Sequence, residues 1–593
     1  MSRGEAYLAK AENNRYITQT IPAPRGLIYD RNNKEMVGNK PANVITFQKL
    51  SEKIQDPMML IGQLSELFKM SPSELYDKMD PDGEKYSFAM PRKIVTNATD
   101  AQVAYVREHA DELPGVNVVQ EPIRVYWEKE LASHVLGYLN NIPKDFWEAH
   151  QDEYQQTDKT GWAGVEKQYE EYLHGKDGKL KVEVNINSQP LSKGKTTEEP
   201  IKGDDVYLTI DSDMQRATQD ALAKQVEELH KTTKTVTEGA AIAMNPKTGE
   251  ILSMASYPYF DPNQSIGGWS NDYYEKVFSK AEKNRAIQER YLPGSTIKMS
   301  TVLIGLKEGA ITPYETIYDP GYINFGDTRI ASWTTGLGSL DARKALAVSS
   351  NVYMIETFRR FGKFQNLNTP SQVEYYLNNT LPAAMDKMLN YHKEFGLGEQ
   401  KTGLDLPYEV AGTVSREGYA SDIAFSSFGQ SENYTLMQLA QFVSTIANNG
   451  KRMEPHIVKE IKATDGKVVK EIQPKMQNQL SFTQDQLKVV QEGMRDVITK
   501  PYGTFSSVFA NYPIAVAGKT GTAETNINNT ENSLFVGYAP YDDPQIAIAI
   551  ILPMNEHNSH SYNSVGPVAK AMMDAYFKLN QKPASNQNAQ KKP

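Results

Sequence analysis

The sequence contains no cysteine, which excludes disulfide bonds and metal sites built from thiolates. It also lacks a long hydrophobic run. The longest, Ile546 to Leu552, has the length of a buried strand, far below the roughly 20 residues of a membrane-spanning helix. No signal peptide is recognisable at Met1. We therefore expect a cytosolic protein or an exported one whose N-terminal anchor is absent from this chain.

The sequence also has fewer basic than acidic residues. The 64 lysines and arginines are outnumbered by 73 aspartates and glutamates, and the formal net charge is −9. This balance argues against nucleic acid as the main partner. The apolar content of 39% and charged content of 23% are typical of a globular chain, and 593 residues are enough for two to four domains.

The pattern along the chain predicts two structured domains and a tail. Residues 1–200 are polar and mix short strands with short helices, whereas residues 201–580 run from strands to helices and back to strands. This order predicts an α+β fold in which helices cover a sheet. Residues 186–204, rich in Pro, Gly, Lys and Glu, form either a linker or an exposed hairpin. Residues 581–593 are of low complexity and expected to be disordered.

Local patterns predict several elements. A strand, a turn and a second strand are expected in PRGLIYDRNNKEMVGN, where Arg25 and Asp30 flank the turn. A helix is expected from Ser212, and a hairpin in GAAIAMNPKTGEILSMASYP. Another helix should begin near Pro370 and end near Pro382.

The stretch RYLPGSTIKMSTV places Ser295 three residues before Lys298, directly after a Pro-Gly turn. The following residues predict a helix that ends at Gly309. Ser295 then lies in the first turn, where free backbone N–H groups favour a developing oxyanion, and Lys298 lies on the same face. The pair is either a nucleophile and its base, which requires a lysine of lowered pKa, or a helix cap followed by a solvated lysine. A second S-x-x-K runs from Ser192 to Lys195.

Two further motifs favour the catalytic alternative, because S-x-x-K, S-x-N and K-T-G together are the signature of serine β-lactamases and penicillin-binding proteins. S-x-N occurs at 349–351, 431–433 and 561–563. We select Ser349 and Asn351, because they lie between two apolar helical stretches, where a loop can face a cleft.

Two K-T-G stretches follow Ser349 and Asn351 along the chain. The first, Lys401 to Gly403, lies in a polar loop, whereas Lys519 to Gly521 ends an alternating apolar strand. A strand edge can pair with an extended peptide, so we select the second stretch.

In this order, Ser295, Lys298, Ser349, Asn351 and Lys519 make the chain resemble a penicillin-binding protein. The N-terminal third resembles the class B, monofunctional transpeptidases: RGLIYDRN matches their pedestal signature, and GVEKQYEEYLHG matches their G-x-E-x-x-Y-x-x-x-L-x-G segment. NPKTGEILSMASYPYFDPN, GLDLP and ANNGKRMEPHIV resemble parts of their transpeptidase domain. One departure is GQSE, at 429–432, where the family usually carries G-Q-G.

The resemblance implies a peptidoglycan D,D-transpeptidase. Ser295 would attack a stem peptide ending in D-Ala-D-Ala, and Lys298 would accept its proton. Ser349 would relay a proton to the leaving group, Asn351 would orient Lys298 and the substrate amide, and Lys519 would keep the network positive. β-Lactams would acylate the same serine.

For substrate binding, the resemblance implies roles for Thr520, Gly521 and Thr522. The threonine hydroxyls would face the substrate carboxylate, and the backbone N–H groups of Ser295 and Thr522 would form the oxyanion hole. No cofactor and no metal are expected; His557 and His560 are too few for a metal site.

The resemblance also implies an architecture, a place and partners. We expect an antiparallel sheet covered by helices and joined by an all-helical lobe, on an elongated α+β pedestal. The protein would belong to the elongation or shape-maintenance branch. It would act on the outer face of the bacterial cytoplasmic membrane, held by an N-terminal transmembrane helix absent from this chain. A membrane-embedded glycan polymerase is an expected partner, and nucleic acid is not.

Two alternatives stay open at this point. The first is a β-lactam hydrolase or D,D-carboxypeptidase on the same fold, for which Glu374 in EYYLN matches the pattern of a deacylating glutamate. The second is a penicillin-binding sensor or scaffold that is acylated without useful turnover.

Overall fold

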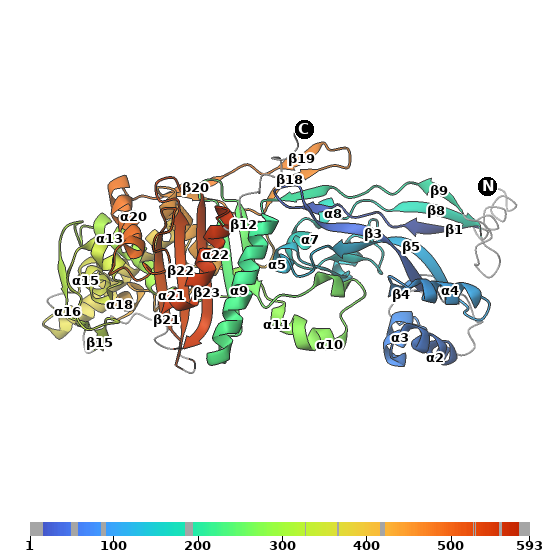
Figure 1. Ribbon diagram of the computed structural model, residues 1–593, viewed down its shortest axis with the longest axis horizontal. Coiled ribbons are helices and arrows are strands. Elements are labelled where there is room, and N and C mark those ends of the chain that lie inside the picture. Colours follow the sequence, from blue (N-terminus) through green and yellow to red (C-terminus); the bar gives the residue numbers. More distant parts are fainter. Residues whose placement is uncertain are drawn as a thin grey trace, which may run out of the picture. The chain divides into compact units, whose positions relative to one another are not determined.

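The computed structural model forms two compact units (Figure 1). The first consists of Met1–Leu208, Phe260–Phe278 and Glu460–Glu471, and the second of the rest of the chain. Among the residues that the structure describes, no helix combines the length and the apolar character needed to cross a membrane. The described residues are 16–48, 57–84, 91–183, 194–325, 328–364, 367–414, 421–525, 527, 529–556 and 560–579.

The first unit is built on two sheets. A seven-stranded sheet has the order β19-β18-β10-β2-β3-β4, with β5 also paired to β3, and a three-stranded sheet has the order β1-β8-β9. The strands are β1 (Tyr16–Ile21), β2 (Ile28–Tyr29), β3 (Glu35–Phe47), β4 (Arg92–Thr96), β5 (Val116–Tyr126), β8 (Gly178–Glu183), β9 (Lys195–Glu198), β10 (Asp205–Leu208), β18 (Val458–Lys462) and β19 (Val468–Glu471).

Short helices and one small hairpin complete this unit. Leu64, Phe68 and Val103 from two of the helices pack with Ile45 and Ile94 of the sheet in one buried apolar cluster. The helices are α2 (Pro57–Phe68), α3 (Pro72–Met79), α4 (Asp100–Glu108), α5 (Ser133–Leu136), α6 (Lys144–Ala149), α7 (Gly164–Gln168), α8 (Glu170–Leu173) and α10 (Asn271–Tyr273), and the hairpin joins β6 (Leu139–Asn141) to β7 (Lys159–Gly161).

Arg25 and Asp30 do not present their charges to solvent at the turn between β2 and β3, because both are buried. Arg25 forms ion pairs of 2.8 Å with Glu166 and with Glu170, and Arg124 pairs with Glu166 at 2.7 Å. Two arginines and two glutamates thus neutralise one another inside the unit. Arg25, the first residue of the pedestal signature, is therefore part of a buried ion-pair cluster.

The predicted hairpin alternative at 186–204 is borne out in its described part. Lys195–Glu198 forms β9 and pairs antiparallel with β8, so this part is no free linker. Ser192 lies outside the described residues.

The second unit is built on a five-stranded antiparallel sheet of order β12-β11-β23-β22-β21. The predicted hairpin is confirmed, since β11 and β12 are joined by the turn at Asn245–Gly249. β21 is an edge strand and carries the K-T-G motif in its middle, not at its end as predicted. The strands are β11 (Gly239–Met244), β12 (Ile251–Tyr257), β21 (Ala517–Glu524), β22 (Thr530–Ala539) and β23 (Ile546–Glu556).

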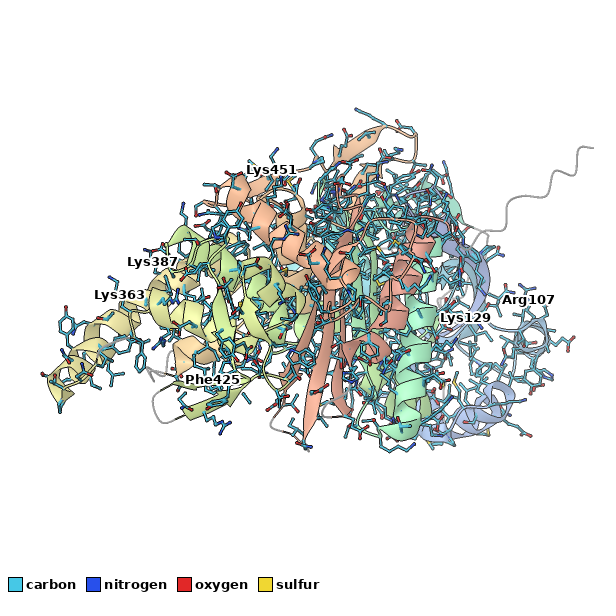
Figure 2. All side chains as sticks on the ribbon, turned by 60° about the vertical axis from the view of Figure 1, so that its left-hand side comes forward. Arg107, Lys129, Lys363, Lys387, Phe425 and Lys451 are labelled. Carbon is cyan, nitrogen blue, oxygen red and sulfur yellow. The ribbon has the colours of Figure 1, made fainter. Side chains whose placement is uncertain are left out.

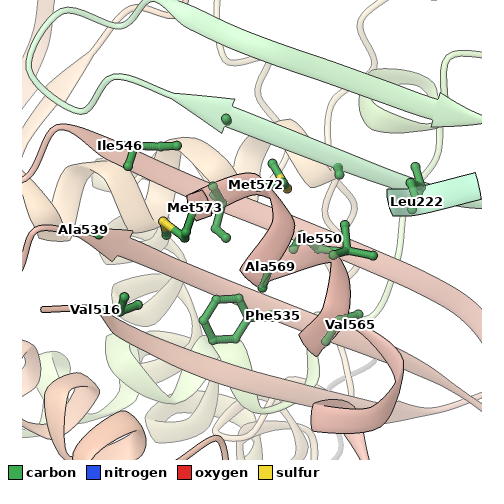
Figure 3. Packing of buried hydrophobic residues seen from close by; sticks show 14 of the residues in the cluster. Leu222, Val516, Phe535, Ala539, Ile546, Ile550, Val565, Ala569, Met572 and Met573 are labelled. Carbon is green, nitrogen blue, oxygen red and sulfur yellow. The ribbon is translucent and has the colours of Figure 1, made fainter. Parts of the chain in front are cut away.

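Helices cover this sheet, as the sequence predicted. Figure 3 shows Leu222 of α9, Phe535 and Ile550 of the strands, and Ala569 and Met572 of α22 in one apolar cluster. All of α19 is buried, and it packs on β11, β22 and β23. The helices are α9 (Ser212–Thr232), which begins at the predicted serine, α19 (Leu436–Ala447), α20 (Gln484–Thr499) and α22 (Gly566–Tyr576).

A further group of helices in the second unit forms a lobe, whose side chains Figure 2 shows around the labelled Lys363 and Lys387. The predicted helix end near Pro382 is wrong. The chain passes from α16 through a π-helical turn into α17, because Pro382 occupies the first turn of α17, where its missing N–H is tolerated. The helices are α13 (Lys298–Lys307), α14 (Ala342–Ala347), α15 (Asn351–Phe361), α16 (Pro370–Tyr375), α17 (Leu381–Glu394) and α18 (Asp422–Ser426).

Candidate active site

Ser295 lies in a 3₁₀ turn, Gly294–Ile297, that leads directly into α13. The backbone N–H of Lys298 donates to the carbonyl of Ser295. In a 3₁₀ turn, residues three apart lie above one another, so the two side chains lie on one side of the chain. Ser295 is half-buried, whereas Lys298 is completely buried. The alternative of a solvated lysine is therefore wrong.

Two glycines allow the chain to pack closely on this turn. Gly429 has a φ of 82° and accepts a hydrogen bond from Gly294 N at 3.0 Å. A Cβ atom at Gly429 would lie 2.2 Å from Gly294 O, and a Cβ atom at Gly521 would lie 2.9 Å from Pro293 O. The turn that carries Ser295 is thus packed between the GQSE loop and strand β21.

Lys298 contacts both selected residues of the S-x-N motif. Its amine donates to Ser349 O at 2.8 Å and to Asn351 Oδ1 at 2.7 Å, and it lies 3.2 Å from Ser349 Oγ. Ser349 follows α14, and Asn351 begins α15, as the two flanking helical stretches predicted. The loop between these helices therefore delivers three oxygen atoms to one lysine.

Lys519 reaches the same serine from the sheet. Its amine donates to Ser349 Oγ at 2.9 Å and to Thr520 O at 3.0 Å. Like Lys298, it is completely buried. The structure thus brings Lys298, Ser349, Asn351 and Lys519 into one hydrogen-bonded cluster.

The pKa values of both lysines are lowered. Burial is the main cause for Lys298, and the charge of Lys519 adds to it, while the charge of Asp319 opposes both. Together these effects hold the pKa of Lys298 well below its ordinary value. Burial lowers the pKa of Lys519 to about 7. A neutral lysine near Ser295 is the form that can accept a proton.

The contacts of Lys298 can be made by an ammonium group and also by a neutral amine. A neutral amine has two N–H groups and one lone pair, and the carbonyl of Ser349 and the side-chain oxygen of Asn351 are two acceptors at short distance. The lone pair is then available for a hydroxyl proton. Ser349 Oγ, which lies between the two lysines, can pass a proton from one side of the cluster to the other.

Strand β21 places Thr520 and Thr522 at the free edge of the sheet. Thr520 Oγ1 lies 2.9 Å from Thr504 Oγ1, and Thr522 Oγ1 lies 3.3 Å from Ser561 Oγ. Thr522 is exposed. Its backbone passes close to the nucleophile turn, since a Cβ atom on Gly294 would lie 2.4 Å from Thr522 O. An extended peptide could pair with this edge beside Ser295.

Sequence reasoning missed three polar residues that contact the motif residues or act on their charge. Thr504 and Ser561 contact β21, and buried Asp319 acts on Lys298. Asp319 and Thr504 belong to none of the short motifs. Ser561 opens the third S-x-N stretch, which lies beside β21, whereas the Lys298 cluster uses the first.

The other K-T-G stretches lie elsewhere. In the stretch that starts at Lys401, Thr402 is buried and its N–H donates to Glu409 at 2.9 Å, which leaves no open strand edge there. The sequence contains two further K-T-G stretches, which the choice between Lys401 and Lys519 did not consider. They begin at Lys159 in β7 and at Lys247 in the turn before β12.

Glu374 is exposed on α16. It lines a cavity of about 500 Å³ that contains no residue of the three motifs; the lining residues are Leu367, Asn368, Thr369, Pro370, Val373, Glu374, Leu377 and Asn378. His557 lies outside the described residues, so the structure does not test that pair of histidines.

Family models match most of the chain. The penicillin binding protein transpeptidase domain matches residues 239–574, and the penicillin-binding protein dimerisation domain matches residues 20–208. One relative, the peptidoglycan D,D-transpeptidase MrdA of Acinetobacter baumannii, is 30% identical over 98% of this chain and 84% of its own.

Solved structures agree with this match. The Helicobacter pylori structure described as a complex between penicillin-binding protein PBP2 and MreC covers 95% of this chain and 99% of its own, with a TM-score of 0.76 and 25% identity. A structure described as the structural coordination of polymerization and crosslinking by a peptidoglycan synthase complex covers 98% of this chain and 94% of its own, with a TM-score of 0.71 and 26% identity.

Proposed function

The chain belongs to the class B penicillin-binding proteins, which combine a dimerisation domain with a transpeptidase domain, and from this premise we propose that it cross-links peptidoglycan as a D,D-transpeptidase. The observation that carries the proposal is the buried cluster in which Lys298 and Lys519 share Ser349, directly beside the Ser295 turn. Burial of two lysines beside one serine disfavours their charged forms and lowers their pKa values. Such strongly shifted pKa values are concentrated at catalytic sites.

In the first step, Ser295 Oγ attacks the carbonyl carbon between the two D-alanines of a stem peptide, and Lys298 takes the hydroxyl proton. The tetrahedral intermediate carries its negative charge on the former carbonyl oxygen, facing the backbone N–H groups of Ser295 and Thr522. The C–N bond then breaks. The proton returns through Ser349 to the departing amine, and the terminal D-alanine leaves.

In the second step, an amine from a neighbouring stem peptide attacks the ester carbonyl of the acyl-enzyme. Lys298 takes a proton from that amine, the new amide forms, and Ser295 Oγ is protonated as it leaves. Thr520, Gly521 and Thr522 hold the donor peptide along the edge of β21. A β-lactam enters the first step, but its opened ring stays attached, so no leaving group departs and the acyl-enzyme persists.

The exposure of Glu374 disfavours the hydrolase alternative. A deacylating base must hold a water within hydrogen-bond reach of the acyl carbonyl, about 2.6–3.2 Å on each side. Glu374 instead lines a cavity outside the three motifs. The first unit, with its own sheets and buried ion-pair cluster, also disfavours a hydrolase, because a hydrolase needs no pedestal domain.

We also propose a branch of the family, a cellular location and partners for this protein. Likeness to MrdA and to the PBP2 solved with MreC supports the elongation or shape-maintenance branch, and likeness to part of a peptidoglycan synthase complex supports a glycan polymerase as partner. The protein would act at the outer face of the cytoplasmic membrane as an anchored enzyme. Residues 1–200 would serve as the pedestal and 201–580 as the transpeptidase domain.

Labelling with a fluorescent penicillin, followed by mass spectrometry of the digested protein, tests the function. We expect one adduct, on Ser295. Ser295→Ala should abolish labelling while the melting temperature stays within a few degrees of the wild type. An adduct on Ser192 or Ser349, or the absence of any adduct on the folded wild type, would overturn the assignment.

A further inference from the structure

Asp319, at the end of β13 (Ile317–Asp319), is a completely buried carboxylate that no motif of the sequence includes. Its Oδ2 accepts hydrogen bonds from Ser350 Oγ at 2.6 Å and from Ser332 Oγ at 2.9 Å, and its Oδ1 accepts one from Gly321 N at 2.7 Å. A buried charge is costly unless such donors compensate it. Three donors at these distances fix the carboxylate in one position.

Ser350, the middle residue of the S-x-N motif, connects Asp319 to the active site. Its hydroxyl donates to Asp319 and accepts from Tyr353 N at 3.0 Å, so it also caps α15. The residue before it, Ser349, has a φ of 56°, which is uncommon for a residue other than glycine. Such a conformation persists only where neighbouring contacts enforce it.

This conformation places both partners of Lys298. The carbonyl of Ser349 and the side chain of Asn351, on either side of Ser350, accept the two short hydrogen bonds of Lys298. A shift of Ser350 would move both acceptors together. The contact between Asp319 and Ser350 therefore controls the geometry of the base without touching it.

The charges around Lys298 give Asp319 a second effect. Lys519, from β21, disfavours a proton on Lys298, and Asp319, from β13, favours one. The side chains that the loop between α14 and α15 contributes to Lys298 are those of Ser349 and Asn351, which are neutral. Asp319 is thus the charge that opposes both burial and Lys519.

We propose that Asp319 is a positioning residue for the acylation step: through Ser350 it holds Ser349 and Asn351 around Lys298, and its negative charge sets the pH range in which Lys298 is the base. The proposal rests on the proposed function, because acylation of Ser295 is the reaction it affects.

The experiment measures the second-order rate of penicillin labelling between pH 5 and pH 10. It compares the wild type with Asp319→Asn, which removes the charge and keeps one acceptor oxygen, and with Ser350→Ala, which keeps the charge and removes the contact. Asp405→Asn is the matched control: Asp405 also accepts two hydrogen bonds, from Ile457 N and Val458 N at 2.6 and 3.0 Å, and does not act on the charge of Lys298.

Without the charge of Asp319, Lys298 should lose its proton more readily. The midpoint of the rising limb in Asp319→Asn is therefore expected about one pH unit lower than in the wild type. Ser350→Ala should keep the wild-type midpoint and lose about tenfold or more in the plateau rate, because the acceptors of Lys298 shift. Asp405→Asn should change neither quantity.

An unchanged or raised midpoint in folded Asp319→Asn would overturn the proposal, since a purely structural role lowers the rate at every pH alike. If Asp319→Asn does not fold, as judged by its melting curve, Ser350→Ala decides, and an unchanged plateau rate would overturn the proposal. A wild type without an adduct on Ser295 would instead refute the proposed function.

Discussion

The side-chain amine of Lys298 lies 2.7 Å from the side-chain oxygen of Asn351. With the carbonyl of Ser349 at 2.8 Å, Lys298 has two acceptors for the two N–H groups of a neutral amine. These contacts fix the position of the amine, whereas burial and the charge of Lys519 favour its neutral form, which is the form that removes a proton.

The rate of β-lactam acylation should rise with pH and level off well below the ordinary lysine value of 10.5. Burial, and then the charge of Lys519, lower the pKa of Lys298. Since only the deprotonated amine accepts the proton of Ser295, the rate increases as pH rises through that lowered pKa and is constant above it. Stopped-flow labelling across pH 5–10 measures the profile, and a flat profile would contradict the assignment of Lys298 as the base.

Lys298→Arg should reduce the acylation rate by about 10²–10⁴-fold, the usual contribution of a general base. Arginine keeps the positive charge but does not lose its proton at physiological pH. Lys307→Arg, on the exposed side of the same helix, is the control and should label at the wild-type rate. Equal rates for the two folded variants would refute the role of Lys298.

Gly429→Ala should slow acylation about tenfold or more. Its methyl group would lie 2.2 Å from the carbonyl oxygen of Gly294, so the Ser295 turn must move, and small displacements of reacting groups are costly. Gly466→Ala is the matched control. Gly466 has a similar φ of 84° but open space around its Cβ position. If both variants label at the wild-type rate, the packing of the GQSE loop on the turn does not position Ser295.

The sequence identified the residues that cluster at the candidate site better than it identified the residues that support them. Ser295, Lys298 and Lys519 belong to short motifs whose spacing is visible along one chain, and the fold class followed from the order of strands and helices. Asp319 was not predictable, because an aspartate at the end of a short strand gives no sign that it will meet Ser350. Contacts between residues far apart in the sequence depend on the tertiary fold.

The same limit applies to Arg25 and to Glu432. A sequence pattern places Arg25 beside a turn, and a turn residue is usually exposed, but the pairing with Glu166 and Glu170 buries it. Glu432 stands in the GQSE departure from the family pattern, which identified the loop as unusual. That it would be completely buried, with Ser426 Oγ donating to it at 2.6 Å, required the structure.

Glu432→Gln should stabilise the second unit at pH 8 and have little effect at pH 5. Burial raises the pKa of Glu432 from 4.5 to about 7. The folded state therefore binds a proton more tightly than the unfolded state, and the free energy of unfolding falls as pH rises from about 4.5 to about 7. Glutamine removes this loss, which amounts to about 3 kcal/mol at most.

Urea denaturation of the wild type and Glu432→Gln at both pH values measures this difference. Glu227→Gln, at an exposed position of α9, is the control and should show no pH-dependent difference from the wild type. A Glu432→Gln difference of equal size at pH 5 and pH 8 would show that Glu432 is not protonated in the folded state.

Glu374→Ala should leave the lifetime of the penicilloyl-enzyme unchanged. Tyr376 is buried beside it, while Glu374 itself is exposed, as expected for a helix that packs through its other side chains. The adduct on Ser295 should last for minutes or longer in both proteins, because Glu374 lines a cavity that includes no motif residue and so does not hold a water at the acyl carbonyl. A preformed adduct chased with excess unlabelled drug gives the lifetime. Turnover within seconds that slows sharply in Glu374→Ala would replace the transpeptidase with a hydrolase.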